Sequence, residues 1–176
     1  LLPKFSLKYT FDPKNNVYAT VSRGYRSGGY NIQMFSDIIQ ALMMRTGGST
    51  TDISKVISYK PEYAWNYELG SHLTLLDGTL WADLAAFYMD TKDQQIAQFS
   101  GSEMGRMMVN AGKSRSYGAE AAIRANVTDE LMLTANYGYT HASFADFNDG
   151  KADYKDNFVP FIPRHTLNIG AQYTVK

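Results

Sequence analysis

Apolar and polar residues alternate with a period of two along most of this chain, and this pattern constrains its fold more than any other feature. In the clearest stretch, Leu131, Leu133 and Ala135 alternate with Thr134 and Asn136. Successive side chains of a β-strand point to opposite faces of its sheet, so the alternation predicts strands with one apolar and one polar face. Stretches with this pattern cover 5–11, 17–25, 63–75, 80–86, 117–125, 131–139 and 167–175. We therefore predict an all-β fold of about seven antiparallel up-and-down strands.

The connections between these stretches alternate between short and long. The short turns are DPKNN, LDGT and NVTDE, and the Asp77-Gly78 pair of LDGT is a strong hairpin signal. Longer connections cover 28–60, 100–105 and 145–160. Antiparallel strands then place the tight turns at one end of the sheet and the loops at the other. Outer-membrane β-barrels have short periplasmic turns and longer extracellular loops, so 28–60 is expected to be a long extracellular loop, with Ser36–Arg45 as a helical candidate within it.

Strand length and aromatic content favour the same class of protein. Several stretches reach the roughly 9–11 residues that a tilted strand needs to cross a bilayer, whereas soluble strands average about 5–6. Aromatic residues gather towards one end of them, and such rings suit the membrane–water boundary. The predicted loop-side girdle comprises Tyr25, Tyr63, Trp65, Tyr67, Tyr117, Tyr137 and Tyr139, with Tyr173 in the opposite girdle. Arg23 falls on the apolar parity, where it either extends to the headgroups or marks a bulge.

Composition excludes several other classes. The formal net charge of zero argues against a nucleic-acid binder held by phosphate contacts. The absence of cysteine excludes a disulfide scaffold, and there is no run of about 18 apolar residues that would form a transmembrane helix. His72, His141 and His165 have no metal-ligand spacing, so no metal site is expected. The segment DFNDGKADYKD resembles a calcium-binding loop only loosely, because its glycine and final acidic residue are misplaced, and a calcium site there is left open.

Five segments occur in this chain order: NVYATVSRGYRSGGYN, KPEYAWNYELG, FYMDTKDQQI, NAGKSRSYGAEAAI and FVPFIPRHTLNIGAQYTV. Together they resemble the barrel of TonB-dependent outer-membrane receptors, most of all the ferric-siderophore receptors of the yersiniabactin/pesticin-receptor type. The resemblance implies a 22-stranded barrel with a plug domain in its lumen. Seven strands are too few to close a membrane barrel. We therefore expect 1–176 to be part of the barrel domain, with the plug and the remaining strands absent.

The resemblance also implies a function. The parent protein would bind a ferric siderophore or a similar large nutrient, and TonB would drive its uptake through the missing plug. The barrel would contact outer-membrane lipid, no cofactor is implied, and the protein would not be an enzyme. Two alternatives remain open: a passive outer-membrane porin, and a soluble β-rich binding domain.

Candidate functional residues follow from position. By strand parity, the residues expected to face the lumen are Glu68, Glu120, Arg124 and Asn136. The loop side supplies candidates for ligand capture, because arginine suits an anionic chelate and aromatic rings suit its apolar or catechol-like parts. These candidates are Arg26, Tyr30, Asn31 and Gln33 on the first long loop, and Arg106 and Asn110 on the second. Ordinary solvation of the loops is the alternative explanation for each. No catalytic arrangement is found.

Overall fold

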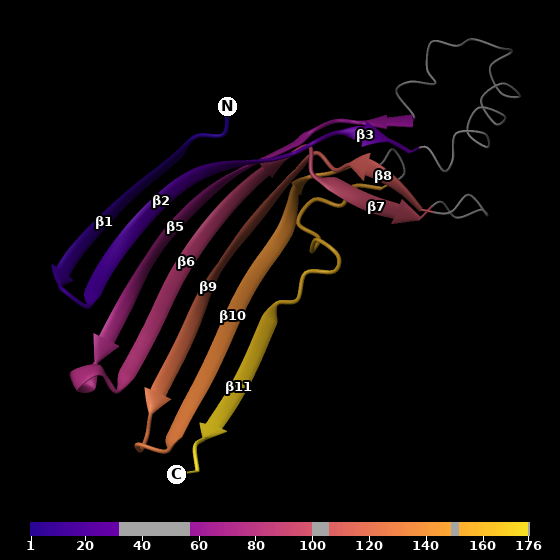
Figure 1. Cartoon of the computed structure of the whole chain (residues 1–176). Helices are drawn as coiled ribbons and strands as arrows, with labels where there is room; N and C mark the ends of the chain where they lie inside the picture. Colours follow the sequence, from indigo (N-terminus) through magenta and orange to yellow (C-terminus); the bar gives the residue numbers. More distant parts are fainter. Residues whose placement is uncertain (32–56, 100–105, 149–151, 176) are drawn as a thin grey trace, which may run out of the picture.

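A single antiparallel sheet of seven long strands makes up most of the structure (Figure 1). The computed structural model describes residues 1–31, 57–99, 106–148 and 152–175. Each long strand pairs with the next long strand along the chain. The strands are β1 (Lys4–Asp12), β2 (Asn15–Arg26), β5 (Glu62–Leu75), β6 (Leu80–Lys92), β9 (Lys113–Asn126), β10 (Leu131–Asp146) and β11 (His165–Tyr173). The predicted all-β, up-and-down architecture is confirmed.

Two small hairpins extend the sheet at its loop end (Figure 1). In one, β3 (Gly29–Tyr30) pairs with β4 (Ser58–Tyr59), and in the other β7 (Gln95–Phe99) pairs with β8 (Arg106–Asn110). The helical candidate Ser36–Arg45 lies outside the described residues. Within the described part of the chain, no helix is long and apolar enough to cross a membrane.

Side chains and backbone geometry fix the tight turns at the opposite end. In the β1–β2 turn, an Asp12 carboxylate oxygen accepts a hydrogen bond from the Lys14 backbone N–H at 2.9 Å. In the β9–β10 turn, Thr128 Oγ1 accepts from the backbone N–H groups of Glu130 and Leu131 at 3.2 and 3.1 Å. The β5–β6 turn contains a short 3-10 segment, η3 (Leu76–Gly78), whose residues all have positive φ. These local bonds and geometries set the register of the three hairpins.

The register gives the sheet two chemically distinct faces. Leu69 lies opposite Ala86, and Leu84 lies opposite Ala121. We call the side that carries these residues the apolar face, and the other side the polar face. Ile169 on β11 belongs to the apolar face and is 73% exposed in this chain. An apolar surface of this extent indicates contact with lipid or protein rather than with water.

Trp81 and Phe87 are large aromatic residues at positions of β6 where alternation would place polar side chains, and both lie on the polar face. The Arg124 guanidinium carbon is 4.3 Å from the centre of the Trp81 ring, a cation–π contact. The Phe87 ring covers Gly118 on β9, where a Cβ atom would come within 2.7 Å of the ring. Each ring therefore has a specific partner on the polar face, and the register of β6 continues without a shift.

Arg23 lies on the apolar face, as its parity predicts. Its guanidinium carbon is 4.5 Å from the centre of the Tyr63 ring. The register between β2 and β5 runs past Arg23 without a shift, so the bulge alternative is wrong.

Aromatic rings form a belt on the apolar face near the loop end. Ring centroids lie 5.2 Å apart in the Tyr25–Tyr63 pair and 4.7 Å apart in the stacked Tyr117–His141 pair. The belt moves towards the turn end from β2 to β10. On β2 and β5 it includes the register pair Tyr25–Tyr63, close to the loop end. On β10 it includes Tyr139, which lies two residues nearer the turns than His141. Strands tilted by roughly 35–45° need such a stagger to keep a belt level.

Candidate functional site

Three side-chain amides bind the two loop-end hairpins together, and we call Asn31, Gln95 and Asn110 the amide clamp. Asn110 Oδ1 accepts a hydrogen bond from the Lys60 backbone N–H at 2.6 Å. Its Nδ2 donates to the backbone carbonyls of Lys60 at 3.0 Å and Asp93 at 2.7 Å. Asn110 therefore joins Lys60, where the first long loop ends, to Asp93, which lies between β6 and β7.

The other two members of the amide clamp act in the same way. The Asn31 side chain accepts from the Met108 backbone N–H and donates to the Met108 carbonyl, both at 2.8 Å. Gln95 Nε2 donates to the backbone carbonyls of Ser27 at 2.8 Å and Lys60 at 3.1 Å. Backbone groups of both loop-end hairpins and of the segments beside them thus find side-chain hydrogen-bond partners here.

A small apolar cluster packs at the loop end of the sheet. The segment after β10 folds back along that strand, with Val159 N–H donating to the Ala142 carbonyl at 3.0 Å and Phe144 N–H donating to the Asn157 carbonyl at 2.9 Å. This brings together Ala111, Ala142, Phe144, Phe147 and Val159, all less than 9% exposed. The loop end therefore has its own packed core.

The structure separates the candidate ligand-capture residues into groups. Arg26 ends β2 opposite Glu62, and Tyr30 is 69% exposed on β3. The amides of Asn31 and Asn110 instead form hydrogen bonds with backbone groups of Met108 and Lys60, respectively. Arg106 pairs with Phe99 through its backbone, and its side chain is not described. Gln33 lies outside the described residues.

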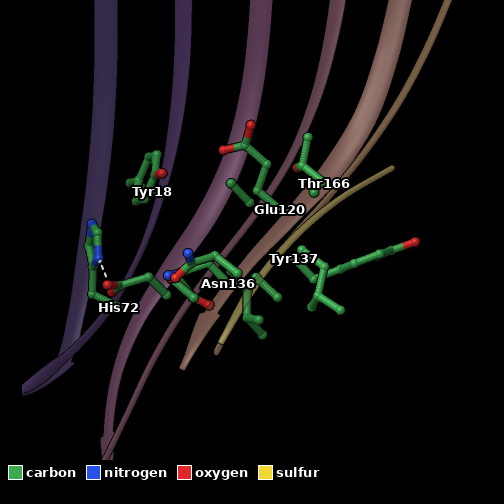
Figure 2. Close-up of a pocket in the computed structure, with 15 residues that line it drawn as sticks. Tyr18, His72, Glu120, Asn136, Tyr137 and Thr166 are labelled. Carbon is green, nitrogen blue, oxygen red and sulfur yellow. Dashed lines mark hydrogen bonds and ion pairs between the residues drawn. The ribbon is translucent and has the colours of Figure 1, made fainter. Parts of the chain in front are cut away.

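A polar network lies on the polar face and extends towards the turn end (Figure 2). His72 Nδ1 and Asp83 Oδ1 are 2.6 Å apart across the β5–β6 hairpin. The His72 ring stacks on Tyr18 with centroids 5.2 Å apart, and the Tyr18 hydroxyl donates to Glu68 at 2.9 Å. Tyr18 has room to lie over β5 because residue 70 is glycine.

The network borders a hollow of about 430 Å³. Its lining includes Tyr18, His72, Asp83, Glu120, Asn136 and Asn168, so carboxylate, amide, imidazole and phenol groups all border it. In Figure 2, Glu120 and Asn136 lie near the network, while the Tyr137 ring points away from it. Such a surface suits water, hydrogen-bond donors or cationic groups.

The four residues expected to face the lumen lie on this same polar face. Glu68 lies opposite Thr20 and Phe87, and Glu120 lies opposite Ala85 and Gly138. Arg124 and Asn136 lie on β9 and β10, nearer the turn end.

Sequence reasoning missed the His72–Asp83 pair, although the sequence contains a signal for it. The two residues are equally distant from the ends of the turn 76–79, and such residues lie opposite each other in a hairpin. The amide clamp has no comparable signal, since its partners are remote in sequence. Among the described residues, no group of three or more His, Cys, Asp or Glu could hold a metal ion.

These features define a class of protein. Long staggered strands, an exposed apolar face, an aromatic belt and a polar opposite face are the properties of a wall segment of a membrane β-barrel. Within the described residues, β1 and β11 are the two edges of the sheet and do not pair with each other, so this segment is open.

The chain belongs to the TonB-dependent receptor β-barrel family. The family model described as TonB dependent receptor-like, beta-barrel, matches residues 1–176. The pesticin receptor of Yersinia pestis is 31% identical over 165 residues, which cover 94% of this chain and 21% of the relative. A metal-pseudopaline receptor of Pseudomonas aeruginosa is 26% identical over 172 residues, covering 97% and 20% of the two chains.

A solved structure shares the fold. The crystal structure of the ferric yersiniabactin uptake receptor from Yersinia pestis superposes with a TM-score of 0.68 at 23% identity, covering 99% of this chain and 23% of that one. The predicted family, the barrel-segment fold and the bacterial outer-membrane location are therefore confirmed, and the soluble alternative is wrong. The relatives are receptors, which also supports the expectation that the protein is not an enzyme. The chain spans about a fifth of the length of these relatives.

Proposed function

We propose that this chain is part of the barrel wall of an outer-membrane receptor that imports a ferric-siderophore-type ligand with energy delivered by TonB. The observation that carries the proposal is the family match along the whole chain, together with the separation of an apolar from a polar face. Relatives named for a ferric siderophore and for a metal chelate support cargo of this kind.

In this proposal each face of the sheet has its own partner. The apolar face, with exposed Leu69 and Ile169, contacts outer-membrane lipid. The polar face lines the lumen, where Glu68, Glu120, Arg124 and Asn136 meet water or the plug of the receptor. TonB acts on that plug, which lies outside this chain.

The loop end captures the ligand. Arg26 and Tyr30 are exposed there and could contact an anionic chelate and its apolar parts directly. Asn31 and Asn110 would shape the mouth through the amide clamp rather than hold the ligand themselves, because their amides already bind backbone groups. Gln33 and Arg106 remain proposed contacts on the same loops.

Uptake by the intact receptor tests this function. The full-length gene is expressed in a host that lacks its own siderophore receptors, with and without a functional TonB. We expect accumulation of labelled iron from one class of ferric siderophore, and only in the TonB-positive host. Equal accumulation without TonB would indicate a passive porin instead. A failure of every ferric siderophore, with uptake of another large nutrient, would overturn the proposed cargo but not the receptor class.

A further inference from the structure

Three cationic side chains lie side by side at the loop end of the apolar face, and we call Lys92, Lys113 and Arg115 the cationic patch. Lys92 on β6 and Lys113 on β9 are direct register partners. Arg115 is two residues further along β9, on the same face. All three residues are exposed. The patch therefore spans β6, the central strand of the sheet, and its neighbour β9 (Figure 1).

The cationic patch lies at the loop-side edge of the aromatic belt, where Lys92 is the direct register partner of Tyr63. Tyr88 precedes Lys92 by four residues on β6, and Tyr117 follows Lys113 by four residues on β9. Four residues of a tilted strand rise roughly 10 Å along the membrane normal. If the belt marks the boundary of the hydrocarbon, the lysine ammonium groups lie at the level of the lipid headgroups on the loop side.

The charges of the cationic patch are only partly balanced by the protein. Like charges directly opposite each other destabilise a sheet, and Lys92 faces Lys113 in this way. Asp90 Oδ1 is 4.0 Å from Arg115 Nε and offsets that cation in part. Asp146 is the register neighbour of Lys113 on β10, beside a register shift. Among the described residues, no ion pair joins either lysine to a carboxylate.

We propose that the cationic patch binds a phosphate group of a phosphorylated lipid in the outer leaflet. An anion between the two lysines would remove their repulsion and accept charge-assisted hydrogen bonds from both ammonium groups. The inference rests on the orientation proposed above, in which the long loops are extracellular.

The surroundings of the cationic patch favour a lipid over a free anion. Below it, the rings of Tyr88 and Tyr117 are 40% and 46% exposed, and Leu84 is 43% exposed nearer the membrane centre. The occupant therefore needs a phosphate at one end and acyl chains at the other. The site is an open sheet surface, so three exposed side chains would hold a free phosphate only weakly in salt-containing water.

The test uses the purified full-length receptor in neutral detergent. Lipid A, enzymatically dephosphorylated lipid A and inorganic phosphate are titrated separately, and bound lipid is measured by native mass spectrometry. We expect saturable binding of lipid A, and no saturable binding of dephosphorylated lipid A or of inorganic phosphate. A K92Q/K113Q double variant should bind it about 30-fold more weakly, at a factor of about five for each lysine near a charged surface. K155Q, a change of an exposed lysine on the segment after β10, is the control and should bind normally.

A charge reversal separates the site from a folding defect. K113E places a carboxylate opposite Lys92 on one side and Asp146 on the other, so the melting temperature of the lipid-free receptor should stay close to that of the wild type, while the stabilisation that lipid A gives to the wild type is lost. The proposal is overturned by equal binding of dephosphorylated lipid, by equal protection from inorganic phosphate, or by unchanged binding in K92Q/K113Q. Lipid binding and iron uptake are measured independently, so failure of one leaves the other standing.

Discussion

His72 Nδ1 and Asp83 Oδ1 lie 2.6 Å apart across the β5–β6 hairpin, on the polar face of the sheet. Both side chains are more than half exposed in this chain. An exposed pair of this kind contributes about 0–1 kcal/mol. A double-mutant cycle with H72A and D83A, followed by thermal unfolding of the full-length receptor, should therefore give a coupling energy below about 1 kcal/mol. A coupling of several kcal/mol would show that the rest of the receptor buries the pair.

Neighbouring residues on β11 test the assignment of the two faces. Ile169 lies on the apolar face and Asn168 on the polar face. An arginine near the bilayer midplane costs about 2–4 kcal/mol on the lipid side of a barrel, whereas lumen positions tolerate charge. I169R should lower the amount of heat-modifiable receptor in outer membranes, and N168R should not. Equal losses from both changes would contradict the assigned faces.

Glycines of the polar face should differ sharply in their tolerance of a methyl group. A Cβ atom at Gly118 would collide with the backbone carbonyl of Tyr139, which cannot move without breaking the sheet. At Gly24 the nearest atom, the Ala64 carbonyl oxygen, is 3.8 Å away. G118A should destabilise the receptor by about 1–3 kcal/mol, whereas G24A should be neutral or stabilise it by about 0.4–1 kcal/mol.

Chemical unfolding of the two glycine variants in the same detergent measures the difference. Removing the Phe87 ring should not rescue G118A, because the colliding carbonyl remains. Full rescue by F87A would mean that the ring, and not the backbone, limits the space.

Loss of the Asn110 side chain should loosen the loop end locally. N110A leaves the Lys60 N–H and the carbonyls of Lys60 and Asp93 without their present partners. We expect a loss of about 1–3 kcal/mol and faster hydrogen exchange at the Lys60 amide. N168A, on an exposed position of β11, is the control and should leave exchange at Lys60 unchanged. Unaltered exchange in N110A would show that the amide clamp does not stabilise the mouth.

Ligand capture should depend on the exposed loop-end residues and not on barrel assembly. R26A and Y30A are expected to raise the KM for uptake of the ferric siderophore about tenfold, the factor that corresponds to loss of about 1.4 kcal/mol of binding. Their outer-membrane levels should equal those of the wild type. Kinetics of labelled-iron uptake provide the measurement, and an unchanged KM in both variants would move the proposed contact elsewhere on the receptor.

The sequence by itself determined the strands, their faces and the end at which the loops gather. Alternation in 131–139 fixes which side chains share a face, because the period of two comes from the backbone of a single strand. The turns at Asp12 and Thr128 are equally local, since their hydrogen bonds span two or three residues. For the same reason the parity of Glu68 and Asn136 follows from the alternation of their own strands.

Only the tertiary structure decided what the loop-end side chains do and why β6 breaks its pattern. Asn31 bonds the backbone of a residue 77 positions away, and Asn110 bonds one 50 positions away. Trp81 and Phe87 lie on the polar face because Arg124 and Gly118 of another strand accommodate them. Such partners depend on the register between remote strands, and no local pattern encodes the register between strands joined by long loops.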